Sequence, residues 1–97
     1  MRQLLWWLIG GSRGGENRLR IVRALEERPM NANQLSNELD LNYKTVQHHL
    51  EILVENDILR TEGGDYGTMY FLTEEMEQHL DILDEVAEQA DLSIDVA

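Results

Sequence analysis

The sequence predicts a mainly α-helical domain with one small β-hairpin and extra helices at both ends. Apolar residues recur at helical spacings in successive segments, and each segment is bounded by a residue type that caps or stops a helix. Two β-prone runs, ILRTE at 58–62 and TMYFLT at 68–73, are bridged by GGDYG, a pattern typical of a hairpin. A chain of 97 residues with 42% apolar content suits a single compact domain.

The first full helix is expected to begin at Glu16 and to end before Pro29. Ile21, Val22 and Leu25 recur on one of its faces. A proline cannot continue a helix, because it lacks the backbone N–H and its ring clashes with the preceding turn.

The second helix is expected to start at Asn31. Asn31 and Gln34 have the spacing of a capping box, in which the asparagine accepts from a free backbone N–H and the glutamine reaches back. Leu35 and Leu39 form an apolar stripe over two turns. The stretch DLN at 40–42 is expected to end this helix.

The third helix is expected to start after Asn42, a favourable N-cap residue, and to run to about Glu55. Val46, Leu50 and Leu53 recur at spacings of four and three. These residues form the predicted inward face of the helix.

The N-terminal segment contains LLWWLI at 4–9, which is far short of the roughly 18 to 20 apolar residues needed to cross a bilayer. A membrane partner is therefore not expected. A short helix that packs its tryptophans onto a neighbour is the favoured interpretation. A signal peptide with a minimal apolar region and the stub of a trimmed membrane segment are the alternatives.

The connector GGSRGG at 10–15 invites comparison with phosphate-binding loops. Such a loop needs a lysine for the phosphates and a hydroxyl for magnesium directly after its last glycine, whereas Glu16 and Asn17 follow here.

Cysteine is absent, which excludes disulfides and cysteine-based metal or redox sites and fits a cytoplasmic location. No cofactor and no small-molecule substrate are expected, and no nucleophile–base pair points to an enzyme.

The C-terminal segment is expected to form a last helix capped by Thr73. Its apolar residues follow the heptad spacing of a helix that pairs with another helix. They are Met76, Leu80, Leu83, Ala87 and Ala90. The final LSIDVA at 92–97 is expected to fray.

Three helices followed by a hairpin are the layout of a winged helix-turn-helix. The chain is therefore divided into an apolar N-terminal helix and connector at 1–15, a winged helix-turn-helix domain at 16–73, and a C-terminal dimerisation helix and tail at 74–97.

The segment PMNANQLSNELDLNYKTVQHHLEILVENDIL at 29–59 resembles the ArsR-like winged-helix transcription regulators. Their consensus T-V-x-x-H-L-x-x-L is matched by Thr45, Val46, His49, Leu50 and Leu53. Together with the helix before it and the hairpin after it, the resemblance covers about residues 16 to 73. It implies a DNA-binding regulator, in which His49 is a packing histidine on the third helix.

The sequence departs from this family's pattern at two positions. Asp57 replaces the glycine that follows the third helix, although aspartate also adopts the left-handed conformation. The wing carries only Arg60 where the family often has several basic residues. The family's metal sensing is not carried over, because the sequence has no cysteine and only three histidines.

The third helix carries a polar face opposite its apolar one. Lys44, Gln47 and His48 fall on that face, and Tyr43 lies beside them in the first turn. In the helix-turn-helix mode this half of the helix enters the major groove, where lysine can donate to guanine and glutamine can pair with adenine. The predicted DNA contacts are Tyr43, Lys44, Thr45, Gln47, His48 and Arg60. Arg18, Arg20 and Arg23 are weaker candidates for phosphate contact, or for ion pairs with neighbouring glutamates.

Double-stranded DNA is an unexpected partner for a chain with a net charge of −11. The charge is uneven, however, because residues 1–60 hold 8 acidic and 8 basic residues, whereas residues 61–97 hold 11 acidic residues and no base. The acidic surface is therefore expected on the part of the chain that follows the wing, mainly on the last helix. A pI near 4.5 resembles that of proteins from salt-accumulating archaea.

A homodimer is expected, because one recognition helix covers few base pairs and such proteins pair two half-sites. The predicted interface combines the N-terminal apolar run with the C-terminal seam. The alternative is that each of these surfaces merely covers the core of its own domain. Its residues are Leu4, Leu5, Trp6, Trp7, Leu8, Met76, Leu80, Leu83 and Ala87. The alternative function is a winged-helix module for protein contact or membrane-tethered signalling that does not bind DNA directly.

Overall fold

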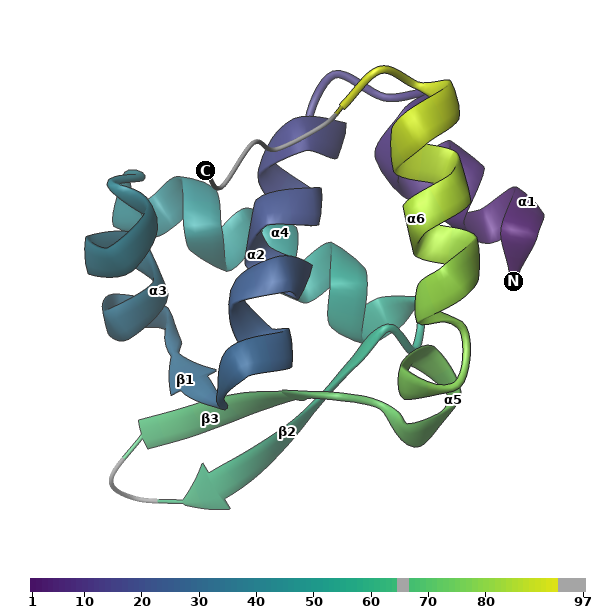
Figure 1. The fold of residues 1–97 in the computed structure, drawn as a ribbon. Coiled ribbons are helices and arrows are strands. Elements are labelled where there is room, and N and C mark those ends of the chain that lie inside the picture. The colour runs from purple at the N-terminus through teal and green to yellow at the C-terminus, as the bar shows by residue number, and fades with distance from the viewer. Residues whose placement is uncertain (65–66, 93–97) are drawn as a thin grey trace.

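The computed structural model describes residues 1–64 and 67–92, and their arrangement confirms the winged helix-turn-helix (Figure 1). The chain passes through α1 (Arg2–Leu5), a π-helical turn η1 (Trp6–Gly10), α2 (Gly15–Glu27), β1 (Met30–Asn31), α3 (Ala32–Leu39), α4 (Tyr43–Glu55), β2 (Leu59–Gly64), β3 (Gly67–Leu72), α5 (Glu74–Glu77) and α6 (Leu80–Gln89). The expected frayed tail lies outside the described residues, except for Leu92.

The N-terminal caps of α3 and α4 are confirmed. The side chain of Asn31 accepts from the backbone N–H of Gln34 at 2.8 Å, and Gln34 accepts from the backbone N–H of Asn31 at 2.9 Å. The side chain of Asn42 accepts from the backbone N–H of Lys44 at 2.8 Å. These bonds satisfy donors that have no partner inside a helix, and they fix where each helix begins.

Three helices end in the same way, with an aspartate in the left-handed conformation followed by an apolar residue. Asp40, Asp57 and Asp91 follow α3, α4 and α6 and have φ values of 53°, 59° and 57°. In each case the next backbone N–H donates to a carbonyl five residues earlier, at 2.8 to 3.1 Å, as in a Schellman motif. This confirms the expectation that Asp57 supplies the conformation usually given by glycine.

The wing is a three-stranded antiparallel sheet in the order β1-β3-β2. The hairpin was predicted, and its register pairs Leu59 with Leu72 and Thr61 with Tyr70. The third strand was not predicted, because it is only two residues long and depends on pairing with β3. Its Met30 is fully buried, which ties the segment before α3 to the sheet.

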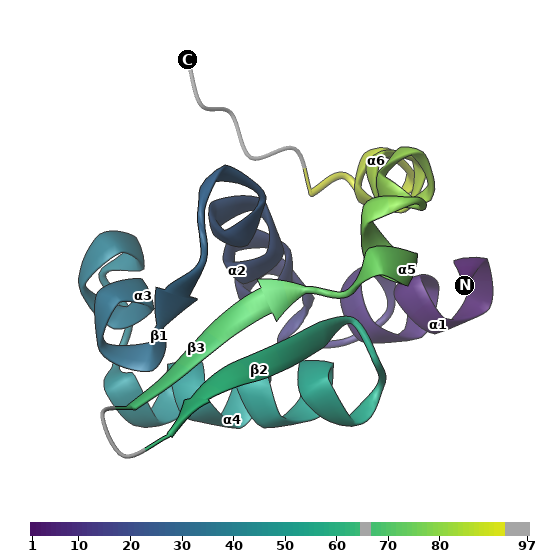
Figure 2. The same cartoon turned by 90° about the horizontal axis from the view of Figure 1, so that it is seen from below.

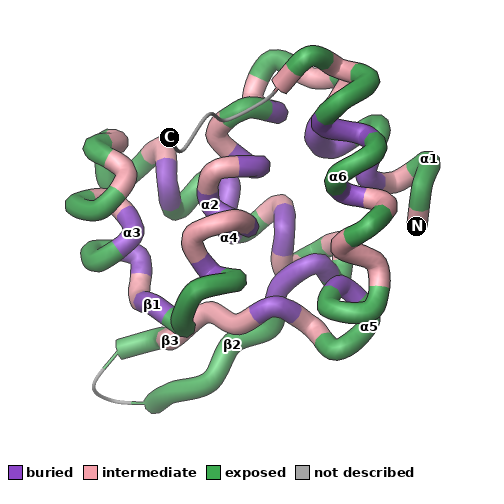
Figure 3. The backbone as a smooth tube through the Cα atoms, in the orientation of Figure 1, coloured by how far each residue is buried: buried purple, intermediate pink, exposed green. Residues whose placement is uncertain are grey.

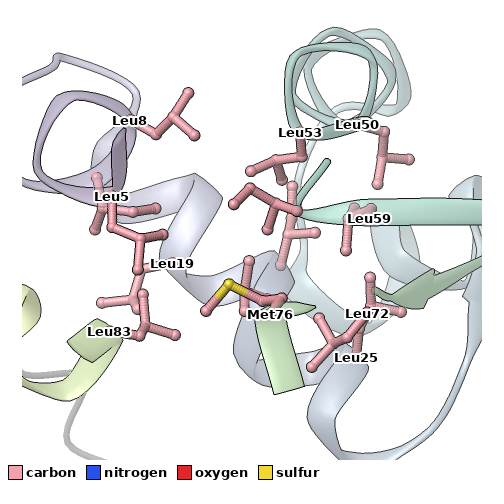
Figure 4. Packing of buried hydrophobic residues seen from close by; sticks show 14 of the residues in the cluster. Leu5, Leu8, Leu19, Leu25, Leu50, Leu53, Leu59, Leu72, Met76 and Leu83 are labelled. Atoms are coloured by element: carbon pink, nitrogen blue, oxygen red, sulfur yellow. The ribbon is translucent and has the colours of Figure 1, made fainter. Parts of the chain in front are cut away.

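The hydrophobic core lies where α2 and α4 pack against the sheet and against the helices at the two ends of the chain. Figure 4 shows leucines from α2, α4 and the strands around Met76 of α5. The predicted inward face of α4 is confirmed, since Val46, Leu50 and Leu53 have no exposed surface. The tube in Figure 3 shows the same alternation of buried and exposed positions along the other helices.

The expected single C-terminal helix is broken. Thr73 caps α5 as predicted, accepting from the backbone N–H of Met76 at 3.1 Å, but the backbone leaves the helical conformation at His79, with φ −124°. The break lets Met76 point into the core while α6 turns to lie beside α1 and η1 (Figures 1 and 2). Heptad spacing predicted the apolar seam but could not predict this change of direction.

The N-terminal segment is helical, and within this chain its tryptophans stay open to solvent. Leu5, Leu8 and Ile9 are buried instead, whereas the exposed fractions of Trp6 and Trp7 are 43% and 63%. The turn closes tightly on α2, because a Cβ at Gly15 would overlap the carbonyl oxygen of Ile9. Among the described residues, no helix has both the length and the apolar character needed to span a membrane.

Candidate nucleic-acid interface

The outer face of α4 is polar and open to solvent. Tyr43, Lys44, Gln47 and His48 are exposed, and Thr45 is half-buried. The buried face of the same helix holds it against α2 and the core, so these side chains project from a rigid support. Figures 1 and 2 show that α4 begins beside α3, whereas α1 and α6 lie at the opposite end of the molecule.

The first turns of α4 are joined by side-chain contacts. The Gln47 amide donates to the Tyr43 hydroxyl at 3.1 Å, so the two side chains form one unit. Tyr70 of β3 is half-buried and is close enough to Tyr43 to feel its charge. Burial raises the pKa of Tyr70, and the neighbouring Tyr43 and Glu51 raise it further. Sequence reasoning missed Tyr70, although its alternation with the buried Leu72 places it on the inner face of the sheet.

Lys44 and Arg60, the two cations among the predicted DNA contacts, differ in their partners. Within residues 1–64 and 67–92 Lys44 makes no ion pair, whereas Arg60 of the wing pairs with Glu62 at 3.0 Å and lies 4.4 Å from the centre of the Phe71 ring. The positive charge of Arg60 is thus partly neutralised within the wing itself. Lys44 is the more available cation for a phosphate or a base edge.

Arg18 is buried, which corrects the expectation that it could contact phosphates or pair with a glutamate. Its Nε donates to the carbonyl oxygen of Leu8 at 2.7 Å, one Nη lies 3.2 Å from Nδ1 of His49, and the other donates to Ser12. Only 6% of Arg18 and 7% of His49 are exposed. Position 18 precedes the buried Val22 and Leu25 by four and seven residues, so helical spacing alone could have placed it on the buried face.

His49 must be neutral for this contact. A guanidinium only donates, so Nδ1 of His49 has to accept, and a proton there would place two cations side by side. Burial lowers the pKa of His49, and the charges of Arg18 and His48 lower it further. The cluster joins η1 and the glycine-rich connector to the back of α4. A Cβ at Gly14 would come within 2.6 Å of the His49 ring.

The other two arginines of α2 are also engaged. Arg20 donates to the carbonyl oxygen of Leu39 at 2.7 Å. Arg23 pairs with Glu26 at 2.9 Å, as expected, and also with Asp84 of α6. Both arginines are thus held by partners within the chain.

The residues predicted for the dimer interface divide into two groups within this chain. Leu5, Leu8, Met76, Leu83 and Ala87 are buried in the chain's own core. Leu4 and Leu80 are half-buried, and Trp6 and Trp7 are exposed. The partner that the C-terminal seam contacts in this structure is therefore the N-terminal segment of the same chain.

No group of three or more histidine, aspartate or glutamate side chains within the described part of the chain could hold a metal ion. His48 and His49 lie next to each other, with ring centres 5.5 Å apart, but His79 lies in the break between α5 and α6. The histidines are thus not gathered at one site.

The fold and the polar face of α4 define a winged helix-turn-helix protein of the type found in transcription regulators. Residues 15–61 match the family model described as "Bacterial regulatory protein, arsR family". This agrees with the resemblance seen in the recognition helix, and with the expectation that the chain is not an enzyme. No curated protein matches the chain.

Solved structures of regulators share this fold. HlyU from Vibrio cholerae N16961 superimposes with a TM-score of 0.68 at 20% identity, covering 88% of this chain and 90% of HlyU. A probable transcriptional regulator from Pseudomonas aeruginosa gives 0.69 at 17% identity, covering 98% and 77%. A MarR transcriptional regulator from Methanosarcina mazei Go1 gives 0.66 at 17% identity, covering 76% and 56%. The fold is thus that of ArsR-type and MarR-type transcription regulators.

Proposed function

We propose that the chain is a sequence-specific DNA-binding transcription regulator that inserts α4 into the major groove. The observation that carries the proposal is the exposed row of Lys44, Gln47 and His48 on a helix whose other face is fully buried. Lysine and glutamine are residue types that read guanine and adenine edges. The match to a family of regulatory proteins supports the same role, in the cytoplasm.

The proposal is tested by selecting duplexes from a random pool in concentrated KCl and measuring affinity by fluorescence anisotropy. Gln47→Ala should cost about 1–3 kcal/mol of binding free energy and relax the preference at one base pair. Gln89→Ala, which removes an exposed glutamine from α6, is the matched control and should bind like the wild type. Failure to select any duplex, or equal affinity for the two variants, would reject the recognition role of α4.

We also propose that the functional unit is a homodimer. Trp6 and Trp7 are exposed and Leu4 and Leu80 are half-buried, and the elements α1, η1 and α6 that carry them contact one another at the end of the molecule away from the start of α4. In this proposal the buried members of the predicted interface act indirectly, by holding α1 and α6 together. Two-fold pairing through this end would leave both copies of α4 free to meet successive half-sites.

Sedimentation tests the dimer directly. The wild type should sediment with twice the chain mass, and Trp7→Glu should lower that mass toward one chain. Tyr43→Ser removes an exposed aromatic residue from the opposite end and should leave the mass unchanged. A wild type that is monomeric at micromolar concentration would contradict the proposal.

The acidic composition supports a finer proposal, that the protein works in the concentrated salt of a halophilic archaeon. Ordinary DNA binders gain affinity by releasing counterions, and that gain largely disappears in multi-molar salt. Base contacts and apolar burial would then have to supply most of the affinity. The salt dependence of DNA binding, described in the Discussion, tests this point.

The second candidate function is a winged-helix module for protein contact or membrane-tethered signalling. The exposed Trp6 and Trp7 favour it, as does the pairing of Arg60 with Glu62, which weakens the wing as a phosphate contact. It becomes the better proposal if no duplex is selected while Trp7→Glu abolishes capture of a partner protein or binding to liposomes.

A further inference from the structure

A groove with a volume of about 720 Å³ runs between α2, α3 and α6, which are labelled in Figure 1. Its volume falls within the range of about 300–1,000 Å³ that is usual for small-molecule sites. Much of its wall is apolar and is formed by Leu19, Ala24, Leu39, Ala87 and Leu92. The groove lies apart from the polar face of α4, so DNA recognition does not account for it.

Carboxylates dominate the rim of this groove. They are Glu26, Glu27, Glu38, Asp84, Glu88 and Asp91, against the two guanidinium groups of Arg20 and Arg23. Arg23 is held by Glu26 and Asp84, and Arg20 donates to the carbonyl oxygen of Leu39. Both cations therefore already have partners, and an anionic ligand would face a surplus of negative charge.

Three of the rim carboxylates are exposed and carry no ion pair within the described residues, namely Glu27, Glu88 and Asp91. Glu38 differs, because it pairs with Arg28 at 3.2 Å. An apolar wall next to unpaired carboxylates suits a molecule that has an apolar body and a positive charge.

We propose that the groove binds a small hydrophobic organic cation, such as a substituted ammonium or phosphonium ion. The body of the ligand covers Leu39, Ala24 and Ala87, which removes apolar surface from water, and its charge lies near the carboxylates of Glu88 and Asp91. Because the rim is solvent-exposed, the charge term is modest and weakens with salt. The site does not depend on the proposed binding of DNA.

Two ions of the same shape and opposite charge test the site. Tetraphenylphosphonium should bind the full-length protein at low ionic strength and shift the NMR signals of Ala24, Leu39 and Ala87. Tetraphenylborate should bind at least about tenfold more weakly, because it contacts the same apolar wall but its negative charge is repelled by the carboxylates of the rim. No binding of the phosphonium ion, or equal binding of the two ions, would overturn the proposal.

Variants locate the charge that the ligand meets. Glu88→Gln combined with Asp91→Asn should weaken phosphonium binding by about three- to twentyfold, from two exposed charge pairs. Glu74→Gln combined with Glu75→Gln removes the same number of charges from α5, outside the groove, and should leave affinity within about twofold.

The exposed tryptophans offer a competing site, since aromatic faces also attract cations. Trp7→Ala should therefore leave phosphonium affinity unchanged if the groove is the site. Loss of binding in Trp7→Ala, with signal shifts confined to α1 and η1, would overturn the proposal in favour of a cation–π contact at the N-terminal end.

Discussion

Replacing Arg18 by methionine removes the guanidinium that joins α2, η1 and α4 while keeping a side chain that can fill much of the same space. Two well-formed bonds are lost, at 2.7 Å to the Leu8 carbonyl oxygen and 3.2 Å to His49. Hydrogen bonds to charged groups contribute about 1.5–3 kcal/mol each. Relief from burying the guanidinium charge offsets part of that loss.

The Leu8 carbonyl oxygen keeps one partner in the variant, because the Ser12 hydroxyl also donates to it at 3.0 Å. The main uncompensated group is Nδ1 of the buried His49. We therefore expect Arg18→Met to lower the free energy of unfolding by about 2–3 kcal/mol. For a domain of this size that corresponds to a fall in Tm of roughly 10–20 °C.

Urea unfolding followed by circular dichroism measures the change, with Arg28→Met as the matched control. Arg28 is exposed, and among the described residues its one ion pair is with Glu38, so its replacement should cost less than about 1 kcal/mol. If Arg18→Met is as mild as Arg28→Met, the buried cluster does not hold the N-terminal segment to α4, and the reasoning fails.

Three further predictions concern pH, salt and packing. The pKa of His49 is lowered in the folded protein, so its contribution to stability is present above pH 6.5, the usual histidine value, and is lost as the pH falls through the folded-state pKa. Urea midpoints should therefore be lower at pH 5 than at pH 7.5. His49→Gln should reduce this difference between the two midpoints. Affinity for a selected duplex should change little or even rise with KCl, whereas a steep fall, near −0.9 in the log-log slope for each neutralised phosphate, would show ordinary counterion release. Leu83→Ala should cost about 2–5 kcal/mol of unfolding free energy and Leu80→Ala clearly less, because only Leu83 is fully buried; equal costs would mean that α6 packs differently.

The elements that could be predicted from the sequence are those whose signals lie within a few residues. The capping box of Asn31 and Gln34, the cap at Asn42 and the left-handed Asp57 each depend on local spacing. The polar face of α4 was also predictable, because helical periodicity separates Lys44 and Gln47 from the apolar face.

The features that were missed depend on contacts between distant segments. β1 exists because Met30 pairs with Tyr70, and the helix break at His79 exists because α6 turns to pack on α1. Charge type misled the interpretation of Arg18, since an arginine was assumed to face solvent. Its spacing of four and seven residues from Val22 and Leu25 is the signal that places it on the buried face.

The aspartates that end α3, α4 and α6 place a negative charge where a helix dipole already disfavours one. Three such turns make the connections of the domain sensitive to the cations around it, and a medium rich in potassium would offset the repulsion. Asp57→Asn keeps the left-handed geometry without the charge, so it should raise Tm in dilute buffer and change it little in concentrated KCl. Each of these turns should therefore become more stable as the concentration of cations rises.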